Sequence, residues 1–375
     1  MIWRFMKVLH CYRTFFPESQ GGLEQAIFEM ASNSEGSEVL TLADLPYKAN
    51  FESVPVRASR RWFSLASCCV GPGLITTLFK KQADLLHLHF PWPFGDIAYL
   101  CAGRRRPLVV TYHSDIVRQR FLGAFYTPLM RWFLGKADRI VATSPEYLAS
   151  SPVLQKYAHK VEVIPLGISE SSYPAVAPPT LVELSDQYGR DFMLFVGALR
   201  YYKGLEYLVR ASVSLPFPVL IAGKGPEEER LKRLALEVGA DNVLFLGHVT
   251  DEEKLGLLKL CRAVVFPSHL RSEAFGVSLL EGLMVGKPLI STAICTGTSY
   301  VNIDQKTGHV VPPADVGALR CAMQDLWENP GKSDAWGKAA RARYERLFTA
   351  RKMARAYDDL YRRVLGERSV EKAVN

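Results

Sequence analysis

The feature that most constrains the fold is a strand–loop–helix–strand pattern in the stretch 263–291. A short apolar segment, Ala263 to Phe266, leads into a turn-rich loop, and an apolar helix is predicted from about Gly276 to Val285. Gly286 ends this helix, Pro288 prevents it from resuming, and a second buried strand follows. The pattern is half of a parallel βαβ unit, whose loop lies at the carboxyl end of the strand. Ligands of open α/β sheets bind at that end.

The loop of this unit is suited to binding an anion. Backbone N–H groups near Phe275, Gly276 and Val277 are free at the helix N-terminus, where the helix dipole favours negative charge. Glu273 lies in the loop and Glu281 lies eight positions later on the helix. Because apolar residues flank Glu281, its carboxylate is predicted to be buried and to need a partner. The two glutamates are therefore candidates for binding ligand hydroxyl groups, against the alternative of two solvated acids.

Length and composition indicate a globular protein of two domains. The chain has 375 residues, 48% hydrophobic and 22% charged. The net charge of +8 favours an anionic partner, such as a nucleotide diphosphate, acidic lipid or nucleic acid. Nucleic acid is disfavoured because the basic residues are scattered among acids. Seven cysteines without a C-x-x-C pair favour reduced thiols in the cytoplasm.

Neither a membrane span nor a metal site is expected. No uncharged apolar run of about 18 residues occurs, and residues 1–10 lack the apolar core of a signal peptide. His87 and His89 share one face of a predicted strand, but the spacing offers no third ligand.

The strand–turn–helix pattern recurs along the chain. In the first half, Gly21 and Gly22 follow a strand over 7–10, residues 43–56 read as irregular, and His113 ends a strand over 108–113. In the second half, two candidate cations, Arg200 and Lys203, lie in such turns. The other turn residues singled out there are Gly197, Gly223, Gly225 and His248. Cations at such a turn can offset the negative charge of a bound phosphate or diphosphate group.

Basic residues beside aromatic ones suggest an interfacial segment. Arg57, Arg60 and Arg61 precede Trp62-Phe63, and a second basic cluster spans 104–106. The alternative is a core-facing helix with a solvated arginine edge. The first interpretation predicts peripheral attachment to a membrane surface.

The segment Ser272-Glu273-Ala274-Phe275-Gly276, followed by Glu281-Gly282, resembles the E-x7-E motif of retaining glycosyltransferases of family four. The resemblance implies an α/β GT-B fold, with two Rossmann-like domains whose parallel sheets face across a cleft. Four segments are similar to bacterial O-antigen mannosyl- and D-rhamnosyltransferases: His87-Leu-His-Phe-Pro-Trp-Pro, Thr111-Tyr-His-Ser-Asp, Leu199-Arg-Tyr-Tyr-Lys-Gly and Gly297-Thr-Ser-Tyr-Val-Asn. We expect an acceptor domain over 1–173, a linker over 174–190, a donor domain over 191–350 and a C-terminal helix over 351–375 returning to the first domain.

The resemblance also implies roles for individual residues. Glu273, Lys203, Arg200 and His113 are the expected catalytic residues, and His87 and His89 are expected on the acceptor side. Residues matching the donor site are Gly21, Gly22, Gly197, Gly223, Gly225, His248, Ala274, Phe275, Gly276, Val277 and Glu281. The family pattern G-R-L-x-x-x-K-G has alanine here at Ala198, which leaves open whether Arg200 supplies the missing cation.

The implied reaction is transfer of a hexose, mannose or D-rhamnose, from a GDP-sugar without a metal or other cofactor. The acceptor would be a glycan, polyprenyl-diphosphate-linked, in lipopolysaccharide O-antigen biosynthesis. The alternatives are a UDP-sugar transferase and a GT-B sugar-nucleotide 2-epimerase, which would release a free sugar nucleotide.

Overall fold

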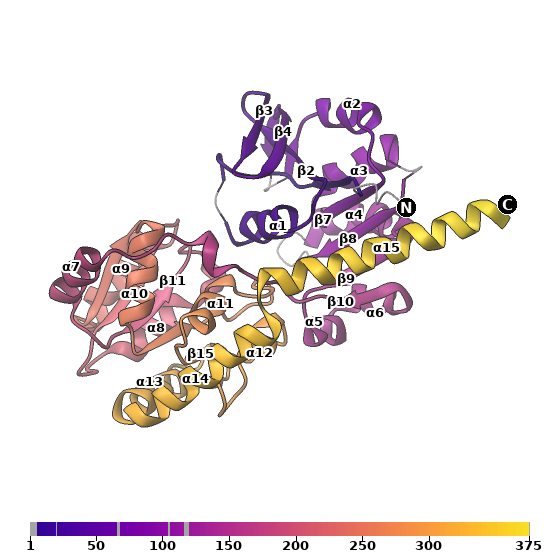
Figure 1. Cartoon of the computed structure of the whole chain (residues 1–375). Helices are drawn as coiled ribbons and strands as arrows, with labels where there is room; N and C mark the ends of the chain where they lie inside the picture. Colours follow the sequence, from indigo (N-terminus) through magenta and orange to yellow (C-terminus); the bar gives the residue numbers. More distant parts are fainter. Residues whose placement is uncertain (1–5, 20, 66–67, 104–105, 116–119, 375) are drawn as a thin grey trace. The chain divides into compact units, whose positions relative to one another are not determined.

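The computed structural model describes residues 6–19, 21–65, 68–103, 106–115 and 120–374. The chain forms two units (Figure 1). Unit 1 comprises Met1–Gly167 and Ala350–Asn375, and unit 2 comprises Ile168–Thr349. Unit 2 is thus one continuous segment, whereas unit 1 is built from both ends of the chain.

Unit 1 is built around an eight-stranded sheet of order β10-β9-β8-β7-β1-β2-β4-β3, parallel except for β3. Its central strands are nearly continuous apolar runs and are buried along their length, as expected for a parallel sheet covered on both faces. The strands are β1 (Val8–Cys11), β2 (Ser37–Ala43), β3 (Tyr47–Phe51), β4 (Val54–Arg60), β7 (Leu85–Phe90), β8 (Leu108–Tyr112), β9 (Arg139–Ala142) and β10 (Val161–Val163), with a separate hairpin of β5 (Phe63–Leu65) and β6 (Cys68–Val70).

The helices of unit 1 include the C-terminal one, which lies along the sheet near β8 and β9 (Figure 1). They are α1 (Gly22–Ser32), α2 (Gly73–Lys80), α3 (Pro93–Ala102), α4 (Arg120–Lys136), α5 (Pro145–Ser150), α6 (Pro152–Gln155), the 3₁₀ turn η1 (Ala158–Lys160) and α15 (Ala350–Val374). Tyr357 and Tyr361 of α15 are buried and hydrogen-bond to Thr111 and His87, so this helix belongs to the core of unit 1.

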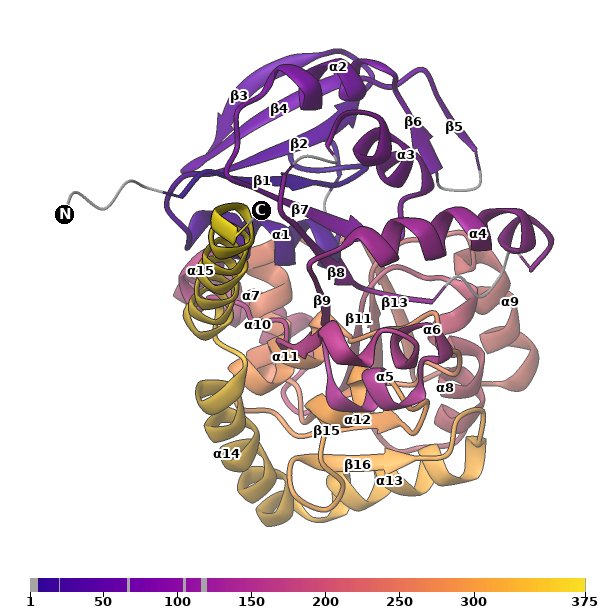
Figure 2. The same ribbon diagram turned by 90° about the vertical axis from the view of Figure 1, so that its right-hand side faces the viewer.

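Unit 2 holds a six-stranded, fully parallel sheet of order β13-β12-β11-β14-β15-β16. Figure 2 shows β16 at one edge, with α13 beside it. The strands are β11 (Met193–Val196), β12 (Val219–Ala222), β13 (Val243–Gly247), β14 (Ala263–Phe266), β15 (Leu289–Thr292) and β16 (Gly308–Val311). The helices are η2 (Glu170–Ser172), α7 (Pro178–Tyr188), η3 (Tyr201–Lys203), α8 (Leu205–Ser212), α9 (Glu228–Val238), α10 (Asp251–Leu260), α11 (Val277–Met284), α12 (Gly297–Val301), α13 (Val316–Glu328) and α14 (Pro330–Leu347).

The structure corrects the prediction for the stretch 43–70. Residues 43–56 are not irregular, because they include β3 and the start of β4. The basic and aromatic segment is not a helix: Arg57 and Arg60 lie on β4, and Trp62 leads into the β5–β6 hairpin. Arg104 and Arg105 lie outside the described residues.

Two further segments contain more regular structure than the sequence indicates. Residues 178–188, inside the predicted linker, form α7. The segment that begins at Gly297, one of the four similar to known transferases, starts with the short helix α12.

A buried carboxyl group in unit 1, that of Asp96, is expected to make the free energy of unfolding depend on pH. Asp96, in the first turn of α3, is 2% exposed and accepts a hydrogen bond from the Tyr126 hydroxyl. Burial raises the pKa of Asp96 from 3.8 to about 8, against a lowering effect of that hydrogen bond. The carboxyl group therefore keeps its proton in the folded chain at pH values where the unfolded chain has lost it.

We expect Asp96→Asn to stabilise the protein in a pH-dependent way. The contribution of a carboxyl group with a raised pKa is fully present at acidic pH and is lost as the pH rises toward 8. A neutral amide avoids this loss, so the gain is expected to reach about 4 kcal/mol at pH 7 and to fall below about 1 kcal/mol at pH 4. Urea unfolding at both pH values measures it. Glu35→Gln, at an exposed position, is the control and should show no such trend; equal effects of the two variants would contradict the prediction.

Candidate functional site

Loops at the carboxyl ends of β11 and β12 touch through their glycine backbones. A Cβ atom at Gly223 would lie 2.0 Å from the carbonyl oxygen of Gly197, and one at Gly225 would lie 2.3 Å from that of Leu199. Gly197 and Gly223 also have positive φ angles, +149° and +136°. The predicted donor-site glycines Gly197, Gly223 and Gly225 thus lie together, and each has a backbone or packing reason to be glycine.

Lys203, in the loop after β11, contacts Glu273, in the loop after the neighbouring strand β14. Lys203 ends the 3₁₀ turn η3 after β11, and Glu273 lies in the loop after β14. Gly204 allows the two loops to meet, because its Cβ would lie 2.1 Å from the carbonyl oxygen of Pro267. Lys203 Nζ donates to Glu273 Oε2 at 2.5 Å, and both side chains are 11% exposed.

The Lys203–Glu273 pair is supported on several sides. The Lys203 ammonium lies 4.4 Å from the centre of the Phe266 ring and 5.5 Å from that of Tyr202. Ser268 Oγ contacts the same carboxylate oxygen at 3.5 Å. The structure therefore joins two residues that the sequence places 70 positions apart, as a buried ion pair at the carboxyl ends of β11 and β14.

The N-terminus of α11 has the expected geometry. Gly276 adopts the left-handed conformation, with φ +85° and ψ 77°, and α11 begins at Val277. The carbonyl of Ala274 accepts the N–H of Gly297 at 2.8 Å, and Phe275 is buried. These contacts connect the loop after β14 to the start of α12. They place the first turn of α11 at the carboxyl ends of the strands.

Glu281 is buried with partners, as the sequence predicts. Its side chain is 6% exposed, Lys254 Nζ lies 2.9 Å from Oε1, and the Tyr173 hydroxyl donates to the same oxygen at 2.9 Å. Burial, the largest effect, lowers the pKa of Lys254, but Glu281 and Asp251 together raise it above its ordinary value. Because both contacts use Oε1, the second oxygen, Oε2, is engaged by neither.

Two predicted residues of unit 2 have exposed side chains. Arg200 is exposed in the loop after β11, and its carbonyl accepts the N–H of Lys203 at 3.0 Å. His248 is exposed directly after β13. The structure brings neither side chain to the Lys203–Glu273 pair, so their assigned roles stay predictions.

In unit 1, Gly21 and Gly22 begin α1 as expected. Gly21 is the N-cap residue in extended conformation, and both glycines are exposed. Beneath them lies Glu24, which is 7% exposed and accepts hydrogen bonds from Thr14 at 2.7 Å and Ser19 at 2.8 Å. Glu24 is a buried carboxylate in this turn that the glycine pattern did not indicate.

Four histidines of unit 1, His10, His87, His89 and His113, form a buried group. His10 Nδ1 lies 3.2 Å from His89 Nε2, and His89 Nδ1 lies 3.0 Å from His113 Nε2. His87 contacts the Tyr361 hydroxyl at 2.7 Å and the Thr111 hydroxyl at 2.6 Å. The parallel pairing of β1 with β7 sets His10 opposite His87, which is why His10 joins the group.

Burial favours the neutral form of all four imidazoles. Burial lowers the pKa of His10 and of His113 to about 3, with a further lowering at His113 from Arg13. Burial, together with neighbouring imidazoles, lowers the pKa of His87 and His89 well below 6.5. A neutral imidazole offers one donor and one acceptor, which suits a chain of this kind.

His10 supplies the third imidazole that the sequence spacing did not reveal. One ring nitrogen from each of His10, His87 and His89 lies within 4.8 Å of the others. A divalent ion there would displace hydrogen bonds, because His10 Nε2 is the one ring nitrogen of these three without a partner among the described residues. The group also holds no carboxylate to balance an ion's charge. A neutral hydrogen-bonded network fits the arrangement better than a metal site.

Sequence reasoning missed four residues that support the predicted sites; three reach the sites through tertiary structure, whereas Glu24 has partners 10 and 5 positions away. They are His10, Glu24, Tyr173 and Lys254. The sequence indicates that the buried Glu281 carboxylate needs a partner. It does not indicate that this partner is Lys254 or Tyr173, which lie 27 and 108 positions away.

Two family descriptions match the chain. Residues 21–172 match the family described as Glycosyltransferase Family 4, and residues 184–343 match Glycosyl transferases group 1.

Two curated relatives match over nearly their whole length. D-rhamnosyltransferase WbpZ of Pseudomonas aeruginosa is 47% identical, with 92% of this chain and 93% of the relative covered. O-antigen chain mannosyltransferase C of Escherichia coli is 42% identical, with 97% and 100% covered.

Solved structures show the same fold. Sucrose-phosphate synthase from Thermosynechococcus elongatus superimposes with a TM-score of 0.81 at 21% identity, covering 96% of this chain and 100% of that one. WaaG, a glycosyltransferase involved in lipopolysaccharide biosynthesis, gives 0.70 at 18% identity, covering 94% and 98%. The predicted α/β, GT-B fold class with parallel sheets is confirmed.

Proposed function

Since the chain belongs to the family-four, group 1 glycosyltransferases, we propose that it transfers mannose or D-rhamnose from a GDP-sugar to a growing O-antigen-type surface polysaccharide. The observation that carries the proposal is its 47% and 42% identity, over more than nine tenths of the chain, to a D-rhamnosyltransferase and an O-antigen mannosyltransferase. Both relatives are named as transferases, which favours transfer over epimerisation. A polyprenyl-diphosphate-linked glycan on the cytoplasmic side of the inner membrane is the proposed acceptor.

The chemistry of unit 2 supports a retaining transfer without a metal ion. As the bond from the sugar C1 to the diphosphate oxygen breaks, negative charge collects on the diphosphate, where the Lys203 ammonium can offset it. Arg200 is the proposed second cation. The acceptor oxygen then bonds to C1 on the same face that the diphosphate leaves, and its hydroxyl proton passes to the departing diphosphate.

The two glutamates are proposed to hold opposite ends of the donor. Glu273 receives hydroxyl groups of the transferred sugar, and its ion pair with Lys203 fixes its orientation beforehand. Glu281 receives the ribose hydroxyls through Oε2, since Lys254 and Tyr173 occupy Oε1. In unit 1, His113 is proposed to hydrogen-bond to the donor sugar or the acceptor.

Nucleotide binding tests the donor proposal. We expect GDP to raise the melting temperature of the purified protein, whereas UDP, ADP and dTDP do not, because a ligand that binds only the folded state stabilises it. The shift should be the same with EDTA. A shift with UDP alone would replace the GDP-sugar by a UDP-sugar, and a GDP shift that EDTA abolishes would overturn metal independence.

Peripheral membrane attachment is a further part of the proposal. Trp62 is 67% exposed, Phe63 53% and Phe79 76%, and the neighbouring Arg60 and Lys80 are exposed cations. Among the described residues, no helix combines the length and the apolar character needed to cross a membrane. Aromatic side chains beside cations suit the surface of an anionic bilayer.

We expect the protein to sediment with vesicles containing anionic lipid at low salt. The double variant Trp62→Ser/Phe79→Ser should bind at least about tenfold more weakly, since it loses two apolar side chains from the interface. Neutral vesicles are the control. Absence of sedimentation with the anionic vesicles would refute membrane attachment.

A further inference from the structure

Unit 2 contains a cavity of about 320 Å³ at the amino ends of its central strands. Its floor is formed by residues that precede β11, β14 and β15, including Asp191, Arg262 and Lys287. The candidate donor loops lie at the opposite ends of the same strands, about 13 Å away for strands of four residues. Helix α11 begins at the donor loops, and the turn that follows it reaches this cavity at Gly286.

The remaining wall of the cavity is the first half of α14. Gly337 makes this possible, because a Cβ atom there would lie 2.3 Å from the carbonyl oxygen of Gly286. The backbones of α14 and of the turn after α11 therefore touch, and the residues next to the contact, Lys287 and Lys338, line the same space.

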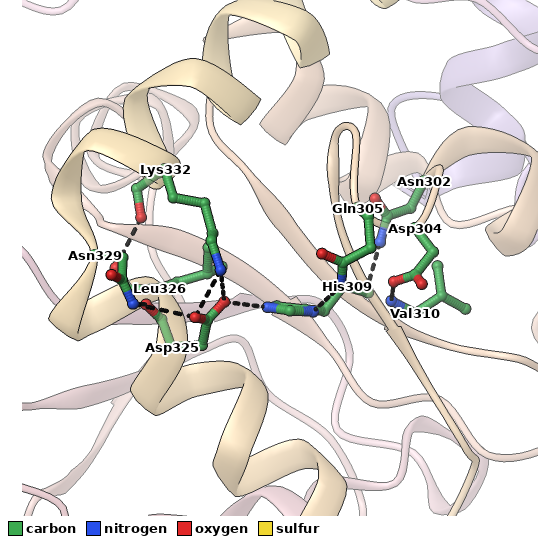
Figure 3. A network of polar contacts seen from close by, with 10 residues as sticks. Asn302, Asp304, Gln305, His309, Val310, Asp325, Leu326, Asn329 and Lys332 are labelled. Atoms are coloured by element: carbon green, nitrogen blue, oxygen red, sulfur yellow. Dashed lines mark hydrogen bonds and ion pairs between the residues drawn. The ribbon is translucent and has the colours of Figure 1, made fainter.

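The start of α14 is held in place by a polar network (Figure 3). Asp325 of α13 accepts hydrogen bonds from Lys332 at 2.8 and 2.9 Å and contacts His309 Nε2 at 2.6 Å. Ser333, which lines the cavity, donates to the carbonyl of Leu326 at 2.7 Å. The wall of the cavity is thus fixed by contacts to α13 and β16 rather than by Lys287 and Lys338, which line the cavity.

The basic groups of the cavity fall into two classes. Arg341 is used structurally, since its guanidinium contacts Glu345, Glu170 and the carbonyl of Met284. Lys287 is half-buried and Lys338 exposed, and neither has an ion pair or hydrogen bond from its side chain in the part of the chain that the structure describes. These two ammonium groups are available to a ligand.

Arg262, which lines the cavity, has an unsatisfied donor. Its side chain is 16% exposed and pairs with Asp191 at 3.1 Å through Nη2, while its buried Nε has no hydrogen-bond partner among the described residues. A buried guanidinium N–H without an acceptor is unfavourable, and an anionic oxygen would satisfy it.

We propose that this cavity binds a small phosphorylated sugar, at a site separate from the proposed donor site. Lys287, Lys338 and Arg262 would hold the phosphate group, because charge-assisted hydrogen bonds from cations are the strong ones. The carboxylates of Asp191 and Asp334, which also line the cavity, would accept hydroxyl groups of the sugar. A cavity of this volume is at the lower end of the range for small-molecule sites.

Calorimetric titration of the full chain with mannose 6-phosphate and with mannose tests the proposal. We expect mannose 6-phosphate to bind and mannose to bind at least about tenfold more weakly, as the loss of charge-assisted contacts implies. Lys287→Gln/Lys338→Gln should weaken mannose 6-phosphate binding by at least about tenfold. Its melting temperature should stay unchanged, since neither lysine has a side-chain partner to lose among the described residues.

Two further variants test whether binding depends on this cavity. Lys259→Gln/Lys306→Gln removes the same charge at exposed positions outside the cavity and should bind like the wild type. Lys203→Ala should also bind mannose 6-phosphate normally, because its change is confined to the donor loops. Undiminished binding by Lys287→Gln/Lys338→Gln, or an equal loss in Lys259→Gln/Lys306→Gln, would overturn the proposal, whereas failure of the donor assignment would leave it unaffected.

Discussion

Replacement of Lys203 by alanine is expected to lower the turnover number of sugar transfer about 10²–10³-fold, or about 2.7–4 kcal/mol of transition-state stabilisation. The Lys203 side chain is 11% exposed and its ammonium lies near the rings of Phe266 and Tyr202, so its charge is expected to act on a departing diphosphate with little screening. Steady-state rates with the donor nucleotide sugar that binds and a glycan acceptor measure the loss. Near-normal turnover would refute the role assigned to Lys203.

Stability must be separated from catalysis in this experiment. Lys203→Ala leaves the Glu273 carboxylate buried without its cation, which is destabilising in itself. The double variant Lys203→Ala/Glu273→Gln removes that buried charge and should recover much of the lost stability while staying inactive. Lys259→Ala, at an exposed position of α10, is the control for loss of a positive charge.

The free energy of unfolding of unit 1 is expected to fall steeply as the pH drops below about 6.5. The pKa values of His10, His87, His89 and His113 are lowered by burial, so the unfolded chain binds protons that the folded chain does not. Stability therefore rises with pH in this window and is lost on acidification, by about 1.4 kcal/mol per pH unit for each histidine. Asp96 opposes this with one group of opposite sign, leaving roughly 4 kcal/mol per pH unit once the pH lies well below 6.5.

Urea unfolding followed by circular dichroism between pH 7 and pH 5 at constant ionic strength gives this slope. His10→Gln should reduce it by about 1.4 kcal/mol per pH unit. His159→Gln, at an exposed position, should leave it unchanged. A flat profile in the wild type would mean that the buried imidazoles take up protons without unfolding, and the neutral network would then be wrong.

The parallel strands and the candidate donor loops were predictable because their signals are local. Runs such as Met193–Val196 and Ala263–Phe266 are wholly apolar, and glycine or proline marks the turns that follow them. The turn that ends α11 at Gly286 needs a positive φ angle of +71°, which a glycine followed closely by a proline indicates. The eight-residue spacing of Glu273 and Glu281 identified both carboxylates before their surroundings were known.

The edge of the sheet in unit 1 was harder to predict. In β4, Val54, Val56 and Ala58 alternate with exposed or half-buried residues, a period-two signal that begins within a segment read as irregular. Antiparallel β3 carries exposed Lys48, Ala49 and Asn50, which have little strand propensity. This strand is therefore stabilised by its pairing with β4 rather than by the preferences of its own residues. The histidine chain could not be found at all without the pairing of β1 with β7.

The division of the chain has a consequence for its synthesis. All residues of unit 2 emerge from the ribosome as one segment, whereas unit 1 starts with the first residues and is completed by α15, the last helix. Until Tyr357 and Tyr361 are made, Thr111 and His87 lack the tyrosine hydroxyl groups that they bond to in the core. Because translation proceeds from the N-terminus, unit 2 can fold before unit 1 is complete. The N-terminal part of unit 1 stays incompletely packed until α15 has been synthesised.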